Sequence, residues 1–284
     1  MLWLYEIPLW ALGLLVVGIF VVVSVLGLLL TRPLVRWLGP PENDFANYFI
    51  SGIGVFYALL IGLIAVAVWE RYSSVEAVIT SEGVAIAQMY RDLEGYPSPE
   101  REVLRAKLRS YVIHVLDTDW PAQQRGVKPK TSPQVNEIVK YLVRFEPKTT
   151  GQTVIHAECV RQLNALLAYR RERIGSIEGA LPTVMWFVVL AGSAVAIALT
   201  YLFSSLNRRL HLTLTAALSC MIGLVIFLII TLDRPLVGTV SVGDDGFRDL
   251  LTRIMKVEAS SKPEPTNTGA LSIEAGEKVR HLGG

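Results

Sequence analysis

Residue types that commonly perform catalysis or bind metal ions are few and scattered in this sequence. The histidines are His114, His156, His211 and His281, and the cysteines are Cys159 and Cys220. His156 and Cys159 lie three residues apart on a predicted helix and could share a soft metal ion, but two ligands do not complete a site. The sequence has no phosphate-binding loop, nucleophile elbow, HExxH zinc motif or Cys-x-x-Cys pair. We therefore expect a protein that is not an enzyme and that holds no metal or cofactor.

An enzyme would need polar side chains that the fold gathers from separate segments. His114, Asp117 and Asp119 brought beside His156 would form such a cluster. Finding them within ligand distance would revive an intramembrane or lipid-handling enzyme as a hypothesis.

One carboxylate stands out because of its position. Glu82 falls on the apolar stripe of a predicted helix, between Ile79 and Ile86. A buried carboxylate needs a partner, such as an arginine or a helix N-terminus, or else it stays protonated. Two interpretations remain open, a structural ion pair and a residue of an ion pathway.

Two faces of one apolar segment could serve a channel. Small residues at helical spacing, which let another helix approach closely, are Gly54, Ala58, Gly62 and Ala65. That face could pack inside one chain or against copies of itself around an axis. On an adjacent face, Ser51, Val55 and Leu59 form a row that could line a narrow hydrophobic throat. Positions facing lipid or the core of the chain would fit these three residues equally well.

These residues belong to a chain dominated by four apolar blocks. Hydrophobic residues make up 52% of the 284 positions, charged residues 18%, and the mean hydropathy is +0.44. The blocks are residues 7–30, 48–69, 182–203 and 212–232, and none contains Asp, Glu, Lys or Arg. About 20 such residues are enough for a helix to cross a bilayer. We predict an all-α integral membrane protein with four transmembrane helices, and the net charge of +2 argues against nucleic acid as a partner.

We expect these spans to form two hairpins with a helical domain between helices 2 and 3. The first hairpin covers residues 1–69 and the second residues 182–232. Residues 70–181 show a helical apolar period without a strand pattern, which predicts a helical extramembrane domain. The C-terminal segment, residues 233–284, is predicted to be disordered after about residue 257. Arginines flank the spans on both sides, so charge leaves the sidedness of the middle domain open.

Several motifs extend along most of the chain. They are the stretch from Gly52 to Ala58, then Trp69, Glu70 and Tyr72, then Glu82, Tyr111, Asp119 and Trp120, then Pro182 with Trp186, and finally Leu232 to Pro235. Together they resemble the bestrophin-like membrane family of bacteria and plants. The resemblance reaches to about residue 255.

The bestrophin-like family is itself similar to the bestrophin anion channels, and this similarity implies a homopentamer with the middle domain and termini in the cytoplasm. Aligning Trp69 and Tyr72 places the aromatic neck of bestrophins on the row Ser51, Val55 and Leu59. Anchoring the alignment on Phe56-Tyr57 instead shifts the neck by about one turn.

The same resemblance bears on calcium. Asp244 and Asp245 match only a remnant of the acidic run that binds calcium in bestrophins. Solvated aspartates in a Gly-rich turn are the ordinary alternative, and the spacing does not fit an EF-hand.

The uncharged spans limit the function to passive roles. Proton-coupled or sodium-coupled transport usually requires ionisable groups at membrane depth. Our leading hypothesis is a non-enzymatic protein of the bacterial inner membrane, a bestrophin-like oligomeric anion channel with its pore near span 2. Its expected partners are the lipid bilayer, copies of the same chain and an inorganic anion. The alternative is a membrane-anchored interaction or sensory scaffold without transport.

Overall fold

The computed structural model describes residues 7–38, 43–129, 132–179, 181–202, 207–238 and 241–255. Within these ranges all regular elements are helical and no strand occurs, which confirms the predicted all-α class. The helices are α1 (Leu9–Leu38), α2 (Asn43–Asp92), α3 (Glu100–His114), α4 (Trp120–Gln124), α5 (Pro133–Arg144), α6 (Thr150–Gly175), α7 (Thr183–Thr200), α8 (Arg208–Leu232) and α9 (Asp245–Asp249). Five-residue π-helical turns follow α3 and α9, at Val115–Asp119 and Leu250–Ile254.

Four helices are long and apolar enough to cross a membrane. The qualifying stretches are Leu9–Pro33, Ser51–Gly95, Thr183–Thr200 and Arg208–Leu232. They overlap the four uncharged blocks of the sequence, so the prediction of four candidate spans is confirmed. The disorder predicted after about residue 257 concerns positions outside the described residues.

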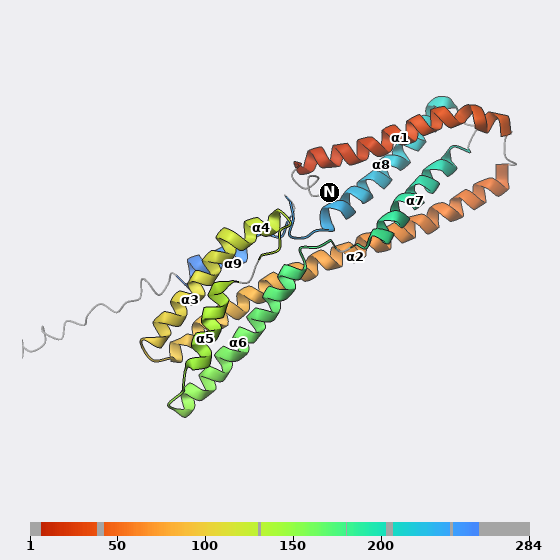
Figure 1. The fold of residues 1–284 in the computed structure, drawn as a ribbon. Helices are drawn as coiled ribbons and strands as arrows, with labels where there is room; N and C mark the ends of the chain where they lie inside the picture. Colours follow the sequence, from red (N-terminus) through yellow and green to blue (C-terminus); the bar gives the residue numbers. More distant parts are fainter. Residues whose placement is uncertain are drawn as a thin grey trace, which may run out of the picture.

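Helix α2 organises the molecule. It runs for 50 residues, roughly 75 Å at 1.5 Å per residue. Figure 1 shows α1, α7 and α8 along the first half of α2, and α3, α5 and α6 along its second half. Each half contributes to its own cluster of buried apolar side chains, and the half-buried Tyr72 packs against both clusters. One helix therefore joins the two groups of helices.

The first expected hairpin is not a closely packed pair of helices, whereas α7 and α8 of the second do contact each other. Helix α1 lies mainly along α8, while α2 packs against α7 and α8. Close approach of α1 and α8 depends on glycines: a Cβ atom at Gly223 would lie 3.1 Å from Cα of Val17, and one at Gly13 would lie 3.4 Å from the Phe227 ring. The partner of α1 is therefore set by steric fit with α8 and not by its connection to α2.

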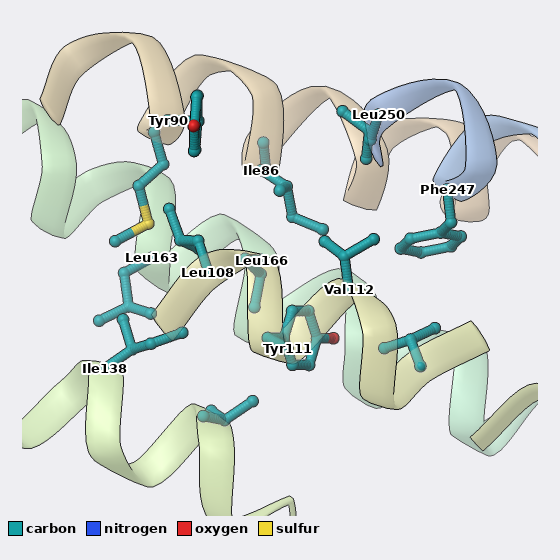
Figure 2. Close-up of a cluster of buried hydrophobic side chains, with 14 of the residues drawn as sticks. Ile86, Tyr90, Leu108, Tyr111, Val112, Ile138, Leu163, Leu166, Phe247 and Leu250 are labelled. Atoms are coloured by element: carbon teal, nitrogen blue, oxygen red, sulfur yellow. The ribbon is translucent and has the colours of Figure 1, made fainter. Parts of the chain in front are cut away.

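The group around the second half of α2 has a dry apolar core. Figure 2 shows Ile86 of α2 above Leu108 and Tyr111 of α3, with Leu166 of α6 alongside. These four side chains are fully buried. Helix α5 closes the core from below with Ile138, which is likewise inaccessible to solvent. The amphipathic pattern of residues 70–181 thus produces a packed helical unit, which α9 joins from the C-terminal side.

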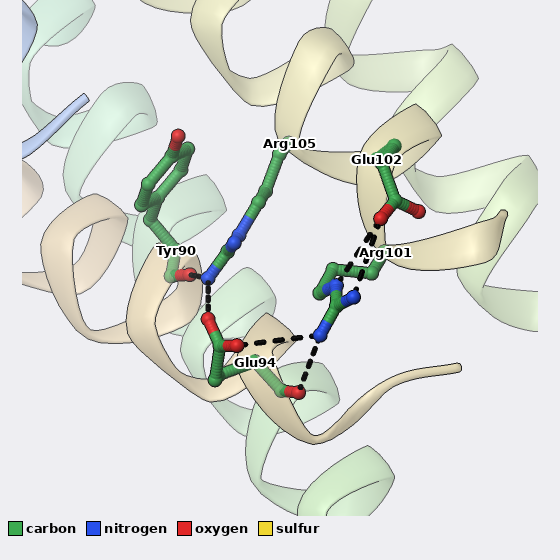
Figure 3. A network of polar contacts seen from close by, with 5 residues as sticks. All are labelled: Tyr90, Glu94, Arg101, Glu102 and Arg105. Atoms are coloured by element: carbon green, nitrogen blue, oxygen red, sulfur yellow. Dashed lines mark hydrogen bonds and ion pairs between the residues drawn. The ribbon is translucent and has the colours of Figure 1, made fainter. Parts of the chain in front are cut away.

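Charged side chains reinforce the turn that connects α2 with α3. Arg105 Nη2 donates to Glu94 Oε2 at 2.6 Å and to the carbonyl of Tyr90 at 3.4 Å. Arg101 donates to both Glu94 and Glu102 at 3.3 Å (Figure 3). These contacts lie at the surface, where each ion pair contributes little to stability. They orient the start of α3, and the core below supplies most of the stability.

Candidate functional site

The row of pore candidates lies on an uncovered face of α2. Val55 and Leu59 are 71% and 62% exposed, and Ser51 is exposed as well. Leu63 and Val66 continue this exposed apolar face along α2. Helices α1, α7 and α8 leave it open, so at membrane depth it must meet lipid, another chain or a channel lumen.

The small residues of α2 border an apolar hollow. Gly54, Ala58 and Gly62 line it together with side chains of α7 and α8, and its volume is about 340 Å³. No described atom lies within 4 Å of a Cβ built at Gly54 or Gly62. The fourth residue of this face, Ala65, is half-buried. Among the described residues of one chain, therefore, no helix uses the close approach that Gly54 and Gly62 allow.

Aromatic and charged side chains mark the end of the apolar half of α2. Trp69 is 58% exposed and Glu70 is exposed, whereas Tyr72 is half-buried between the two groups of helices. Exposed Trp next to the first charged residues is typical of the lipid headgroup level. Such a pattern is typical of a membrane boundary, here near the middle of α2.

Glu82 forms a buried ion pair with an arginine from a distant helix. Arg173 of α6 donates from Nε to Oε2 at 2.6 Å and from Nη2 to Oε1 at 3.1 Å. The Tyr111 hydroxyl of α3 donates to Oε1 at 2.6 Å. Burial, followed by the Glu82 charge, raises the pKa of Tyr111 well above its ordinary value, so this phenol stays a donor. Three helices are thereby joined at one carboxylate.

Arg173 is enclosed as completely as Glu82, since both side chains have no solvent exposure. Burial by itself would lower the pKa of this guanidinium, but the charge of Glu82 and its hydrogen bonds reverse the effect and raise it. The rings of Trp120 and Phe247 each lie 5.8 Å from the guanidinium carbon. Such contacts stabilise a desolvated cation.

A second buried carboxylate lies next to this pair. Asp119 is 2% exposed, at the end of the π-helical turn before α4. Its Oδ2 accepts from Arg170 Nη2 at 3.3 Å, and its Oδ1 lies 3.5 Å from His114 Nε2. Because Arg170 and Arg173 are one turn apart on α6, this helix supplies a cation to each buried acid.

This geometry favours a structural role for the cluster. Glu82 and Arg173 neutralise each other without contact with solvent, so neither offers a surface to a passing ion. Their bidentate geometry gives strong directional bonds, which fix the rotation of α6 and α3 around α2. The cluster therefore sets the orientation of α2, whose other half presents the exposed apolar face.

Comparison with known proteins decides the family. A sequence model of the Bestrophin-like domain matches residues 17–247, most of the chain. The chain belongs to the bestrophin-like family. Among curated proteins none matches the sequence.

Solved structures show that the bestrophin-like fold extends over nearly the whole chain. A crystal structure of a bacterial bestrophin homolog from Klebsiella pneumoniae that carries one mutation has a TM-score of 0.62 at 12% identity, covering 87% of this chain and 98% of that one. A crystal structure of a membrane protein with one proline-to-alanine substitution has a TM-score of 0.61 at 13% identity, covering 84% of this chain and 97% of that one. At these identities the similarity concerns the fold alone.

In this bestrophin-like chain, the turn after α8 brings α9 to the buried ion pair. Pro235 is buried, and its carbonyl accepts from the Val242 amide at 2.8 Å. Gly238 has a φ of 84°, a left-handed conformation that favours glycine, and its amide donates to the carbonyl of Gln124 at 3.2 Å. The returning segment then places Phe247 over Arg173 and 5.7 Å from the Trp120 ring.

The two calcium candidates lie apart from the ion pair. Arg248 Nη2 lies 2.8 Å from Asp244 Oδ2, so the Asp244 carboxylate is already paired with an arginine. Asp245 is exposed in the first turn of α9. Across the described ranges, no three His, Cys, Asp or Glu side chains gather in a way that could hold a metal ion. The chemistry of Asp244 is that of a helix surface ion pair.

His156 and Cys159 both lie beside Tyr96 in the helical core. The Tyr96 hydroxyl and His156 Nδ1 share a hydrogen bond of 2.7 Å, and burial lowers the pKa of His156 below its ordinary value. The ring of Phe145 lies 5.4 Å from the imidazole. His114 and Asp119 instead contact each other near Arg170, so the polar cluster that an enzyme would need is not assembled around His156.

Cys159 is expected to be chemically inert in the folded protein. It is fully buried, and burial raises the pKa of its thiol to about 12. At pH 8 the thiolate fraction is then about 10⁻⁴, so in a Cys220→Ser chain we expect maleimide labelling roughly 1,000-fold slower than for an ordinary cysteine. Labelling in SDS provides the control, because the unfolded chain should react at the ordinary rate. A native rate within tenfold of the SDS rate would contradict the buried position.

Two functional side chains were missed at the level of sequence, Arg173 and Phe247. In the sequence, Arg173 is one of the arginines that flank the third span. A signal for its role was present, however, since Arg173 continues the apolar row Cys159, Leu163 and Leu166 of α6. A cation on one apolar stripe and a carboxylate on another predict a buried pair. Phe247 carried no comparable signal.

Proposed function

We propose that the chain forms a homo-oligomeric anion channel of the bacterial inner membrane, with one α2 from each copy around a shared pore. The observation that carries this proposal is the exposed, uncharged face of α2 at Ser51, Val55 and Leu59. Apolar constrictions of this kind gate a pore by dewetting. Membership in the bestrophin-like family and the fold of a bestrophin homolog support the same function.

Assembly into a ring accounts for the small-residue face as well. A neighbouring copy can approach α2 closely at Gly54 and Gly62, because no other helix in the described part of the chain comes within 4 Å of a Cβ built there. Following the bestrophin resemblance, we propose five copies, with the helices of residues 70–181 in the cytoplasm. The absence of Asp and Glu from residues 48–69 is consistent with anion passage.

Planar bilayers test conduction directly. Purified protein should give anion-selective current, measured from reversal potentials in chloride gradients. Leu59→Ala should raise the unitary conductance about twofold or more, because a wider and less apolar constriction wets more readily. Val55→Ala should act in the same direction. Leu14→Ala is the matched control, since Leu14 is similarly exposed, at 68%, but lies on α1.

Two outcomes would contradict the channel. If intact oligomers gave no current in bilayers, conduction would be refuted. Equal effects of Leu59→Ala and Leu14→Ala would refute the placement of α2 at the pore. Light scattering gives a separate check on assembly. A monomer or dimer excludes an axial pore and favours the membrane-anchored scaffold.

A further inference from the structure

A second hollow lies where the long apolar helices meet the helical group. It has a volume of about 430 Å³ and is lined by residues from α2, the end of α6 and the start of α7. Its apolar side is formed by Val68, Leu181 and Met185, and its polar side by Arg71 and Glu178. Unlike the apolar hollow beside Gly54, it is therefore amphipathic.

The position of this hollow matches the headgroup level of a membrane. Arg71 is the first basic residue after the uncharged residues 48–69, and the exposed Trp69 lies beside it in the sequence. Helix α7, a candidate span, begins at Thr183, next to Leu181. Two spans therefore end at the hollow, where hydrocarbon gives way to phosphate groups.

Its polar side is suited to phosphate. Arg71 Nη2 donates to Ser176 Oγ at 3.2 Å, and the buried Ser176 donates in turn to the carbonyl of Glu172 at 2.9 Å. These bonds hold the guanidinium at the rim, and its five N–H donors are more than one hydroxyl can use. The N-terminal end of α7 adds a partial positive charge. Across the rim, Glu178 accepts from Lys128 Nζ at 2.6 Å.

We propose that this hollow binds a phospholipid, with its phosphate against Arg71 and the upper part of an acyl chain against Val68, Leu181 and Met185. Amphipathic lining at the membrane boundary matches an amphipathic ligand in both chemistry and depth. Because Lys128 neutralises Glu178 across the rim, Arg71 supplies the positive charge that meets the phosphate. This inference does not depend on channel activity.

Two variants test the site independently. Gly175→Leu adds a side chain to the lining of the hollow, and no packing neighbour among the described residues lies within 4 Å of the new Cβ, so the backbone accommodates it. Arg71→Gln removes the phosphate partner. Gly151→Leu, at the other end of α6, and Arg91→Gln, at the far end of α2, are the matched controls because neither residue lines the hollow.

Native mass spectrometry of the delipidated full-length protein, with phosphatidylethanolamine added back, measures the binding. We expect about one tightly held lipid per chain, with retention at least tenfold lower in Gly175→Leu and Arg71→Gln and unchanged in both controls. Circular dichroism verifies folding, and Gly175→Leu decides the result if Arg71→Gln fails to fold.

Three results would overturn the proposal. The first is lipid retention by Gly175→Leu at the wild-type level, and the second is a loss of lipid in Gly151→Leu as large as that in Gly175→Leu. The third is complete displacement of the lipid by millimolar inorganic phosphate. The last result would show that the hollow recognises free phosphate and makes no use of its apolar wall.

Discussion

Replacing Arg173 by methionine should destabilise the chain by about 3–5 kcal/mol, the typical cost of removing one partner of a buried ion pair. The substitution leaves Glu82 without its cation at a fully buried position. Tyr111 alone cannot neutralise the remaining carboxylate. Thermal unfolding in detergent should show a melting temperature lower by roughly 10 °C.

A double variant distinguishes an unpaired charge from lost packing. Glu82→Met combined with Arg173→Met removes both charges, so it should lose less stability than the sum of the two single variants. Arg161→Met is the matched control, because it breaks the exposed pair with Glu158 on the same helix and should leave the melting temperature nearly unchanged. Equal shifts for Arg173→Met and Arg161→Met would show that the buried pair does not carry stability.

Gly223→Val should disrupt the packing of α1 on α8. Its new Cβ would lie 3.1 Å from Cα of Val17, and a backbone atom cannot move aside by changing a rotamer. Overpacking of this kind costs about 1–3 kcal/mol. The measurement is thermal unfolding in detergent, together with the efficiency of a disulfide crosslink engineered between α1 and α8.

Gly18→Val is the control for this substitution, since no packing neighbour in the described ranges lies within 4 Å of its Cβ on α1. Both variants replace glycine by the same β-branched residue within an apolar helix, so their intrinsic helix propensities change equally. A destabilisation of Gly18→Val as large as that of Gly223→Val would assign the effect to propensity and refute the close approach of the two helices.

The first prediction concerns how the exposed face of α2 is oriented. The ion pair fixes one half of α2 against α3 and α6, while α7 and α8 hold the other half. Since α2 is one unbroken helix, its rotation in the helical group also determines which residues face outward at membrane depth. The ion pair of Glu82 therefore also influences which way Leu59 faces, because both residues belong to α2.

Much of this architecture follows from the sequence because it depends on local properties. Four uncharged apolar blocks predict four spanning helices, since a charge at membrane depth is costly and a helix satisfies its own backbone. The helical period of residues 70–181 predicts the remaining helices. Glu82 could be identified as needing a partner from its neighbours Ile79 and Ile86 alone.

Only the tertiary structure decided which faces meet. The period of a helix shows that one side is apolar, but several other helices could cover that side equally well. The partner of Glu82 lies 91 residues away, at Arg173, and α1 packs along α8 because Gly223 and Val17 fit closely. The amphipathic hollow beside Arg71 arises where three segments converge. Such contacts depend on shape and charge complementarity between distant segments, which no local pattern contains.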